Sequence, residues 1–346
     1  MVNIGQVVDL LKKGILVLAF TLLCGAVAVS RAFALEEGDI SAKAAVLYCP
    51  DTGEVLFAKN KDMRLPMAST TKIMTSLLAI ESNTPDLNVI VSEQMVSVEG
   101  SSMGLLPGDS VTLRNLIYGM LLESGNDAAT VTAYVLGDTL QGFAGMMNAK
   151  AKEIGMQNTN FITPSGLDAE EHYSTAYDMA LLAAYAVDNP EFAAACSLKS
   201  IRVDYGNPPY MRTLSNHNRL LDSYEGCFGI KTGFTKKSGR CLVSAAKRDG
   251  VTLVCVTLNA PNDWADHQKL FDYGFETVKS ADLPVEDTLS LSVVGGKASS
   301  VRVEGAYSPK VVFSDSLPEV QNEIFLKPFE YAPVKKGQVL GSVVYR

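Results

Sequence analysis

Ser69 and Lys72 are the pair of residues whose types and spacing could do chemistry. They lie three positions apart in the segment Pro66–Thr75, where an apolar pattern of helical period begins. Side chains at i and i+3 share one face of a helix, so the Lys72 amine would lie beside the Ser69 hydroxyl. A serine hydroxyl needs a nearby base, and lysine can be that base only if burial or another cation lowers its pKa. The pair predicts a nucleophilic serine; the alternative is a helix-capping Ser69 with an exposed Lys72.

Two more short motifs could complete such a site. Ser124–Asn126 reads Ser-Gly-Asn and interrupts two helical patterns, where side chains can project into a cleft. Lys231–Gly233 reads Lys-Thr-Gly in a segment that looks extended. The glycine lets another backbone or a ligand approach closely, the Thr232 hydroxyl could bind a carboxylate, and the Lys231 cation would favour a neutral Lys72. Taken alone, each motif is more typical of a turn or of a strand end.

Residues 1–34 are predicted to be a secretory signal peptide. Lys12 and Lys13 precede an apolar run from Gly14 to Val29, and the small-x-small site Ala32–Ala34 follows. The run is shorter than the roughly 20 residues that span a bilayer. Cleavage is therefore the favoured interpretation, with a retained membrane helix as the alternative. Nothing around Cys24 indicates a lipid-modified cysteine.

The charge and the cysteines exclude several classes of protein. The 346-residue chain has a formal net charge of −8, and loss of residues 1–34 removes three positive charges and one negative, giving −10. An acidic exported protein is poorly suited to bind nucleic acids or anionic membrane surfaces. Five cysteines remain after residue 34, without the paired spacing of a disulfide framework or of a zinc site. The three histidines leave few candidates for a Ser-His-Asp mechanism.

The elements that must position these residues form an α/β (α+β) pattern, with strands at both ends of residues 35–278 and helices between them. This order predicts a sheet covered by helices together with a largely helical subdomain. An Asp-Thr-Gly turn at 51–53 and an Asp-Gly pair at 249–250 indicate hairpins. Strands are expected at Ala44–Tyr48, Val55–Ala58, Val89–Val91, Gly229–Thr235, Cys241–Ala246 and Val251–Leu258. Helices are expected from Ser69 to about Ser82, and at Leu113–Leu122, Asp127–Leu136, Phe143–Ile154 (closed by Gly155), Ser174–Ala186 (capped by Ser174) and Gln268–Val278.

The pattern changes near residue 279. Short β-prone segments follow, separated by Gly, Ser, Pro and Asp, and no helical period is present. Residues 279–346 are therefore predicted to form a small all-β C-terminal domain. Its expected strands are Leu289–Val294, Ser300–Val303, Lys310–Phe313 and Val339–Tyr345.

The three motifs, in this order, resemble those of the low-molecular-weight penicillin-binding proteins, and specifically of the serine-type D-alanyl-D-alanine carboxypeptidases. The resemblance covers about residues 38–278, and the β-rich tail is similar to the small C-terminal domain of that family. It implies a β-lactamase/transpeptidase-like catalytic domain that uses no metal and no cofactor. Further segments carry the likeness: Gly100–Met103, Gly166–Asp168, His172–Ala176, Asn216–Leu221 and Tyr273–Phe275.

The resemblance also implies a reaction. A peptidoglycan stem peptide ending in D-Ala-D-Ala would be attacked by Ser69 at its penultimate carbonyl, while Lys72 takes the serine proton. An acyl-enzyme forms and D-alanine leaves, with Ser124 relaying a proton to its amine, and water then hydrolyses the ester. β-Lactam antibiotics would acylate Ser69 as mimics of the dipeptide. Such an enzyme would act at the outer face of the cytoplasmic membrane or in the cell wall.

Substrate-binding residues follow from the same resemblance. The terminal carboxylate would lie near Lys231, Thr232 and Gly233, and Asn126 would hold a substrate amide. The backbone N–H groups of Ser69 and Phe234 would form the oxyanion hole, a device that is worth several kcal/mol.

The chain departs from its relatives in three places. Phe234 stands where many relatives have His, which bears on substrate preference. Some relatives use an Arg after the next hairpin to hold the carboxylate, but Asn259–Trp264 has none, which leaves Lys231 and Thr232 or another arginine such as Arg240. No amphipathic helix closes the chain, so the protein is expected to be free outside the membrane or held by its N-terminal segment.

Two rival functions stay open from the sequence. A β-lactamase would share the fold, but no Glu-x-x-Leu-Asn run follows Ser124, and the second motif lacks the Asp of Ser-Asp-Asn. A wall-binding or β-lactam-sensing protein without turnover is the other, and the complete set of motifs argues against it. His172 and His217 are interpreted as structural or loop histidines, and Trp264 as a packing residue.

Overall fold

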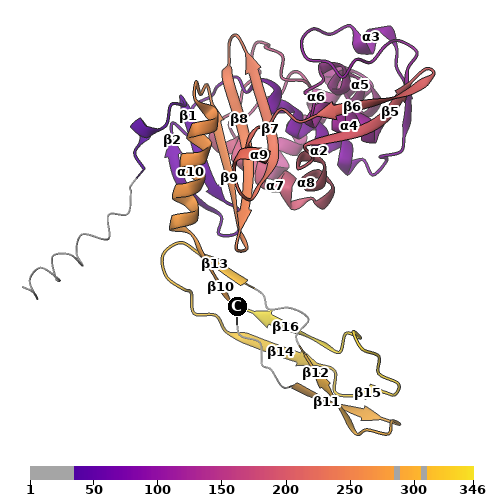
Figure 1. The fold of residues 1–346 in the computed structure, drawn as a ribbon, viewed down its shortest axis with the longest axis vertical. Helices are drawn as coiled ribbons and strands as arrows, with labels where there is room; N and C mark the ends of the chain where they lie inside the picture. The colour runs from indigo at the N-terminus through magenta and orange to yellow at the C-terminus, as the bar shows by residue number, and fades with distance from the viewer. Residues whose placement is uncertain (1–34, 284–288, 305–309) are drawn as a thin grey trace, which may run out of the picture. The chain divides into compact units, whose positions relative to one another are not determined.

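The computed structural model describes residues 35–283, 289–304 and 310–346 (Figure 1). The predicted signal peptide, residues 1–34, lies outside the described residues. No helix of the described residues is both long enough and apolar enough to cross a membrane.

A five-stranded antiparallel sheet contains strands from both ends of the segment between residues 44 and 258. Its order is β2-β1-β9-β8-β7, so the first strand pairs with a strand more than 200 residues later. Both predicted hairpins are confirmed, since β1 pairs with β2 around 51–53 and β8 with β9 around 249–250. The strands are β1 (Ala44–Cys49), β2 (Glu54–Lys59), β7 (Cys227–Thr235), β8 (Gly239–Arg248) and β9 (Val251–Leu258).

Helices cover both faces of this sheet. Helix α10 (Asp263–Thr277) lies along one face, while α2 and α7 lie on the other side, as Figure 1 shows. Helix α10 begins five residues before the predicted Gln268, because Asp263 and Asp266 occupy its first turn, where carboxylates favour a helix start. The other helices are α2 (Lys72–Glu81), α4 (Leu113–Leu121), α5 (Asn126–Gly137), α6 (Leu140–Ile154), α7 (Ala176–Asp188) and α8 (Pro190–Cys196), with short turns η1 (Glu37–Asp39), η2 (Ala68–Thr71), α3 (Glu93–Val96) and α9 (Leu220–Ser223).

Helix α2 is the most deeply buried helix of this part of the chain. Every residue from Lys72 to Ile80 is buried, so the helix lies inside the core rather than on its surface. A helix surrounded on all sides by apolar side chains places any polar group on it in a dry environment. Lys72, at its first position, is such a group.

Three further predicted helix starts differ in detail. Helix α6 begins at Leu140, three residues before the predicted Phe143, because Thr139 caps it and accepts from the Gly142 N–H. The helix expected from Ser69 begins instead with the 3-10 turn η2, and regular α-helix starts at Lys72. Ser174 does not cap α7: its neighbour Thr175 does, accepting a hydrogen bond from the backbone N–H of Asp178. As predicted, α6 ends at Gly155, which has the left-handed conformation with φ 93°.

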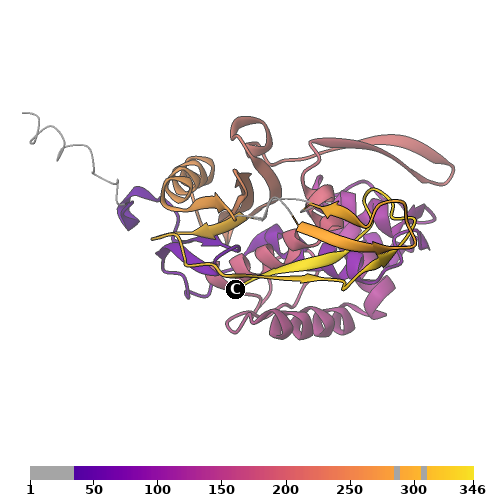
Figure 2. The same cartoon turned by 90° about the horizontal axis from the view of Figure 1, so that it is seen from below.

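The predicted helical subdomain also carries a second sheet, of which the sequence indicated only one strand, expected at Val89–Val91 and found as β3. Four antiparallel strands form it in the order β3-β4-β5-β6. Figures 1 and 2 both show β5 and β6 as a long hairpin that extends away from the five-stranded sheet. The strands are β3 (Asn88–Ile90), β4 (Ser110–Thr112), β5 (Ser200–Gly206) and β6 (Pro209–Ser215).

The segment after residue 278 consists of strands, as predicted. Three of the four expected strands occur at the predicted bounds, and β16 begins two residues later than expected. Small sheets form: β10-β13, β12-β11-β15 and β14-β16. The strands are β10 (Lys279–Asp282), β11 (Leu289–Val294), β12 (Ser300–Val303), β13 (Lys310–Phe313), β14 (Asn322–Leu326), β15 (Glu330–Tyr331) and β16 (Gly341–Tyr345).

Candidate active site

Ser69 lies on the tight turn that precedes α2. The residue before it, Ala68, has a φ of 48°, a conformation that L-residues rarely adopt and that must be held by the surroundings. Ser69 and Lys72 are one turn apart, and the Lys72 Nζ lies 3.0 Å from the Ser69 Oγ. The turn thus presents the hydroxyl directly to the amine.

The Lys72 amine is fully buried and has two other partners. Its Nζ donates to the Asn126 Oδ1 and to the Ser165 carbonyl oxygen, each at 2.7 Å. Burial, and next the positive charge of Lys231, hold the pKa of Lys72 well below its usual range, while the Asp127 carboxylate opposes this shift. The predicted effect of a second cation is confirmed, with desolvation as the larger cause.

These three contacts fit a neutral amine. An uncharged lysine has two N–H donors and one lone pair, whereas the charged form has three donors and no acceptor. The Asn126 and Ser165 oxygens are carbonyl groups and can only accept, so they use both N–H donors. The remaining lone pair then points to the Ser69 Oγ at 3.0 Å, where the hydroxyl can donate its proton.

The Ser-Gly-Asn motif lies between α4 and α5, as the sequence indicated. Ser124 is buried with a φ of 60°, a strained conformation for a residue with a side chain. Asn126 opens α5, and its amide joins two segments: its Oδ1 accepts from Lys72, and its Nδ2 donates to the Glu99 carbonyl oxygen at 2.6 Å. The motif therefore holds both the lysine and the loop before Ser101.

Asp127 fixes the loop from Ser102 to Leu105, a role that the sequence did not reveal. Its buried carboxylate accepts from the Ser102 hydroxyl at 2.6 Å, and from the backbone N–H groups at its own helix start and in the loop. A carboxylate that accepts several N–H bonds holds its donors firmly, because bonds to charged acceptors are stronger than neutral ones. The backbone donors are those of Met103, Gly104, Leu105 and Ala128.

The Lys-Thr-Gly motif lies on β7, beside the Ser69 turn. A Cβ on Gly233 would lie 3.0 Å from the Ser69 backbone nitrogen and 3.1 Å from that of Thr70, so only glycine permits this approach. This is the close approach that the sequence predicted. Lys231 is buried, its Nζ donates to the Thr232 carbonyl oxygen at 2.9 Å, and burial lowers its pKa to about 7.

A cleft of about 330 Å³ joins the first and third motifs with Ser124. Ser69 opens into it from one wall, and β7 forms another wall with the side chain of Phe234 exposed. Lys72, Asn126 and Lys231 are buried and do not line it. The lining residues are Ser69, Ser101, Ser124, His217, Arg219, Thr232, Gly233, Phe234, Arg240, Asp263 and Trp264.

Two arginines lie on the cleft wall, and they differ in their partners. The Arg240 guanidinium is bound to the buried Asp263 carboxylate, 2.8 Å from Nη2, and lies over the Trp264 ring. Arg219 is exposed, and no ion pair of its side chain occurs among the described residues. Trp264 therefore packs against an arginine at the cleft and is not a core residue.

The two histidines singled out by the sequence have different positions. His172 is buried, and both of its ring nitrogens are occupied: Nδ1 accepts from the Ile162 N–H at 2.9 Å, so Nε2 donates to the Thr71 hydroxyl at 3.0 Å. Burial lowers its pKa to about 4. This agrees with a structural role. His217 is half exposed, lines the cleft, and lies 3.8 Å from the Glu123 carboxylate.

Gly166 is a second site residue whose role the sequence did not reveal. Its φ is 84°, and a Cβ there would lie only 1.9 Å from the Ala68 carbonyl oxygen. The glycine therefore lets the 165–167 loop reach the Ser69 turn and place the Ser165 carbonyl on Lys72.

Among the described residues, no cluster of three or more His, Cys, Asp or Glu could hold a metal ion.

Comparisons with solved structures identify the fold. The crystal structure of the Streptomyces K15 DD-transpeptidase superposes with a TM-score of 0.66 at 32% identity, covering 70% of this chain and all of that one. The D-alanyl-D-alanine carboxypeptidase DacD of Francisella tularensis gives a TM-score of 0.69 at 30% identity, with 92% and 91% coverage. The fold is thus that of the DD-peptidases and DD-transpeptidases, as expected.

Proteins that are similar in sequence identify the family of this chain. The D-alanyl-D-alanine carboxypeptidases DacF of Bacillus subtilis and DacC of Escherichia coli are 33% and 32% identical to this chain, covering 94% and 95% of it and 89% and 86% of their own lengths. A family model described as D-alanyl-D-alanine carboxypeptidase matches residues 31–262. The chain belongs to this family, peptidase family S11.

Proposed function

We propose that the protein is a serine-type D-Ala-D-Ala carboxypeptidase of peptidoglycan metabolism, which removes the terminal D-alanine from stem peptides. The observation that carries this proposal is the contact between a buried, low-pKa Lys72 and the Ser69 hydroxyl at the floor of a cleft. Family membership supports the same reaction.

In the first step, Ser69 is the nucleophile and Lys72 is the general base. The Ser69 Oγ attacks the penultimate D-alanine carbonyl, and its proton passes to the Lys72 lone pair as the new Oγ–C bond forms. The low pKa keeps the amine neutral and able to accept at neutral pH, which is the condition for general-base catalysis. The buried Asn126 and Ser165 oxygens then face a charged amine that can still donate to them.

The tetrahedral oxyanion is held by the backbone N–H groups of Ser69 and Phe234. The contact of Gly233 with the Ser69 turn supports this assignment, because it brings β7 and the turn together. The terminal carboxylate binds at Thr232 and Gly233, next to the buried Lys231. The expected contact of Asn126 with a substrate amide does not fit this structure, because both amide atoms of Asn126 are bound to Lys72 and to the Glu99 carbonyl, so Asn126 positions the base.

Collapse of the intermediate breaks the C–N bond. The proton that Lys72 took from Ser69 passes through Ser124, which lines the same cleft, to the leaving amine of D-alanine, and Lys72 becomes neutral again. Water then attacks the acyl-enzyme ester while Lys72 accepts a proton from the water. The Ser69 Oγ leaves and takes that proton back from Lys72. When a β-lactam acylates Ser69, the amine released by ring opening stays attached to the acyl group. This amine cannot diffuse out of the cleft as D-alanine does.

Release of D-alanine from a D-Ala-D-Ala peptide tests this proposal. Wild type should release it, whereas Ser69→Ala should be inactive and Lys72→Arg, whose side chain stays charged, should lose at least about 100-fold in rate. Ser290→Ala, at an exposed serine outside the cleft, is the matched control and should retain full activity. Normal D-alanine release by Ser69→Ala would refute the assignment.

Exposure to penicillin separates the rival functions. A carboxypeptidase should form a long-lived adduct on Ser69, visible as a mass increase of the intact protein. Rapid catalytic hydrolysis of penicillin would favour a β-lactamase, and an adduct without any D-alanine release would favour a sensor. The comparisons give neither rival any support beyond the shared fold.

The setting of the reaction belongs to the proposal as well. The substrate lies outside the cytoplasm, so the enzyme acts at the outer face of the cytoplasmic membrane or in the wall after export directed by residues 1–34. The proposed division is a signal peptide at 1–34, a catalytic domain at 35–278 and a β-rich domain at 279–346. N-terminal sequencing of the exported protein checks the first boundary, and a start far from residue 35 would contradict it.

A further inference from the structure

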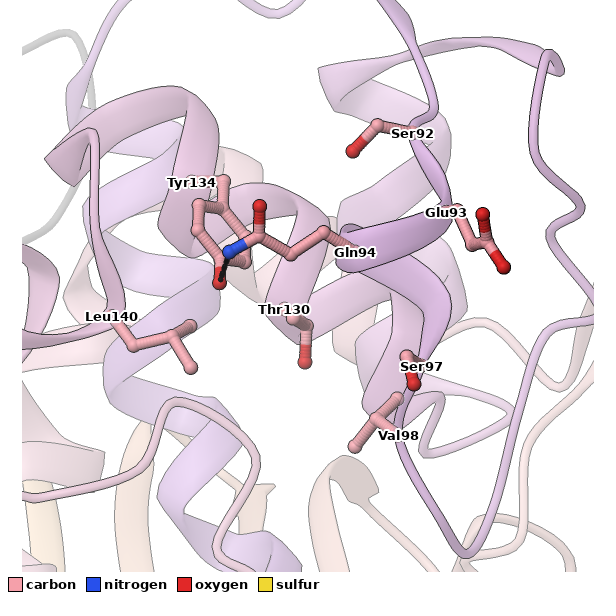
Figure 3. Close-up of a pocket in the computed structure, with 8 residues that line it drawn as sticks. All are labelled: Ser92, Glu93, Gln94, Ser97, Val98, Thr130, Tyr134 and Leu140. Carbon is pink, nitrogen blue, oxygen red and sulfur yellow. Dashed lines mark hydrogen bonds between the residues drawn. The ribbon is translucent and has the colours of Figure 1, made fainter.

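A second and larger hollow lies on the helical side of the molecule. It measures about 790 Å³, within the roughly 300–1,000 Å³ typical of small-molecule sites. One wall is the segment around α3, and the other is α5 together with the first residue of α6 (Figure 3). None of its lining residues belongs to the catalytic cleft, so it is a separate hollow.

The chemistry of this hollow suits a neutral ligand with many hydroxyl groups. Hydroxyls line it at Ser92, Ser97 and Thr130, together with the Gln94 amide and the Tyr134 phenol. Figure 3 shows Gln94 reaching across to Tyr134, where its Nε2 donates to the Oη at 2.8 Å. The single charged group is a carboxylate, and no cation lines the hollow, which disfavours phosphates and other anions.

Apolar surface is also present. Val98 and Leu140 also line the hollow (Figure 3), and Tyr134 is only partly buried. Hydroxyl, amide and carboxylate groups beside a tyrosine and small apolar patches match an N-acetylated amino sugar, which combines hydroxyls with an acetyl methyl group. Tyrosine is suited to such ligands because it offers an apolar face and a polar tip.

The hollow is connected to the catalytic cleft through two short segments. Helix α5 carries Asn126 at its start and Thr130 one turn later, a rise of about 6 Å, and the Thr130 hydroxyl donates to the Asn126 carbonyl oxygen. The other connection runs from Val98 to Ser101, three residues that span at most about 11 Å. Ser101 lines the cleft, and its carbonyl oxygen accepts from the Asn126 N–H.

This spacing matches the proposed substrate. A stem pentapeptide hangs from an amino sugar of the glycan strand, with three residues between that sugar and the penultimate D-alanine. Extended, these three residues span about 10 Å. A peptide with its scissile bond at Ser69, running past Ser101 along the 98–101 segment, would bring its sugar to the hollow.

We infer that the hollow between α3 and α5 is a glycan subsite, which binds an N-acetylated amino sugar of the strand that carries the stem peptide. The inference rests on the proposed function for the identity of the glycan. It assigns Tyr134, Gln94 and Ser97 to substrate preference, outside the catalytic machinery.

Two substrates with the same pentapeptide test the inference: the free peptide and the peptide linked to N-acetylglucosaminyl-N-acetylmuramic acid. Wild type should have a kcat/KM about tenfold higher on the linked peptide, equivalent to about 1.4 kcal/mol. Ser97→Trp, which fills the hollow, should remove this preference, and Tyr134→Phe should reduce it about threefold. Both should leave the rate on the free peptide unchanged. Ser290→Trp and Tyr185→Phe are matched surface controls, at exposed residues outside the hollow, that should keep the preference.

Binding of the disaccharide without any peptide, followed by ligand-observed NMR, gives a readout independent of catalysis. Wild type and Ser69→Ala should bind it, and Ser97→Trp should not. Equal rates on the two substrates, or a preference that survives Ser97→Trp, would overturn the subsite. Inactivity on both substrates combined with disaccharide binding would instead refute the proposed function and leave the subsite standing.

Discussion

The Asn126 Oδ1 lies 2.7 Å from the Lys72 Nζ, so the second motif binds the base of the first. The partner is an amide and not a carboxylate, and this choice matters electrostatically. A carboxylate at this distance would favour the charged lysine, whereas a neutral carbonyl oxygen accepts an N–H without adding a charge. Burial can then keep the amine uncharged.

Asn126→Asp should therefore inactivate the enzyme near neutral pH. The new carboxylate raises the pKa of Lys72, the amine becomes charged, and acylation should fall by about 100-fold or more. Because a base acts only above its pKa, the acid limb of the pH–rate profile should move to higher pH. Penicillin acylation against pH measures this. Asn126→Ala, which adds no charge, is the control, and equal limb positions in the two variants would contradict the argument.

Lys231 should influence the same limb through its charge. The pKa of Lys72 is lowered first by burial and next by Lys231, so Lys231→Met should raise that pKa and move the acid limb of acylation to higher pH. Lys231→Arg keeps a cation and should leave the limb near its wild-type position. The midpoint of the limb is the quantity to compare, since both variants also change carboxylate binding. A midpoint at lower pH in Lys231→Met would contradict the assignment.

Much of the site could be predicted because its chemistry is local in sequence. Ser69 and Lys72 are neighbours on one turn, and Gly233 belongs to a three-residue motif. The contact of the Ser165 carbonyl with Lys72 could not be predicted in this way, because the two residues are 93 positions apart in the sequence. Gly166 was visible as a glycine, but its need for a positive φ against Ala68 appears only when the two loops meet.

The errors in the fold have physical reasons as well. Strand β5 does alternate, with Ile201, Val203 and Tyr205 turned inward between exposed polar residues, so the sequence contained a strand signal there. Strand β6 is largely exposed and lacks that alternation. Ser174 and Thr175 are adjacent and equally suited to cap α7, and only the backbone geometry selects Thr175. The parallel pairing of β11 with β15 joins segments separated by about 35 residues, which local patterns do not encode.

Gly233→Ala should lower both stability and activity. The added Cβ would lie 3.0 Å from the Ser69 nitrogen and 3.1 Å from the Thr70 nitrogen, and both are backbone atoms that cannot move aside without displacing the turn. We expect a loss of about 1–3 kcal/mol in the free energy of unfolding and a large fall in acylation rate. Denaturant unfolding and penicillin labelling measure these.

Gly145→Ala is the matched control for that substitution. Gly145 lies inside α6 with nothing within 4 Å of an added Cβ, so alanine should stabilise the protein by about 0.5–1 kcal/mol and leave acylation unchanged. If Gly233→Ala behaved like Gly145→Ala, the close approach of β7 to the Ser69 turn would not be required for activity.

Asp127→Asn should loosen the loop that leads from Ser101 to Leu105. An asparagine offers one acceptor oxygen in place of two, and its NH₂ would face the N–H groups that the carboxylate now binds. Leaving buried donors unpaired should cost about 2–4 kcal/mol in the free energy of unfolding. Amide exchange of Gly104 and Leu105 should become faster, and kcat/KM should fall because Ser101, the residue before this loop, lines the cleft.

Ser102→Ala is the control for Asp127→Asn, because it removes only the hydroxyl that donates to the carboxylate and accepts from the Gly104 N–H. Gly104 and Leu105 keep their N–H bonds to Asp127. Ser102→Ala should lower the free energy of unfolding by about 1 kcal/mol and should not change the exchange of Leu105. Amide exchange and denaturant unfolding, measured together, therefore distinguish the effect of Asp127→Asn from that of Ser102→Ala. If Asp127→Asn were no more harmful than Ser102→Ala, the carboxylate would contribute through its serine contact alone, and the loop would owe its position to Tyr205 and Arg212, which bind the Met103 and Gly104 carbonyls.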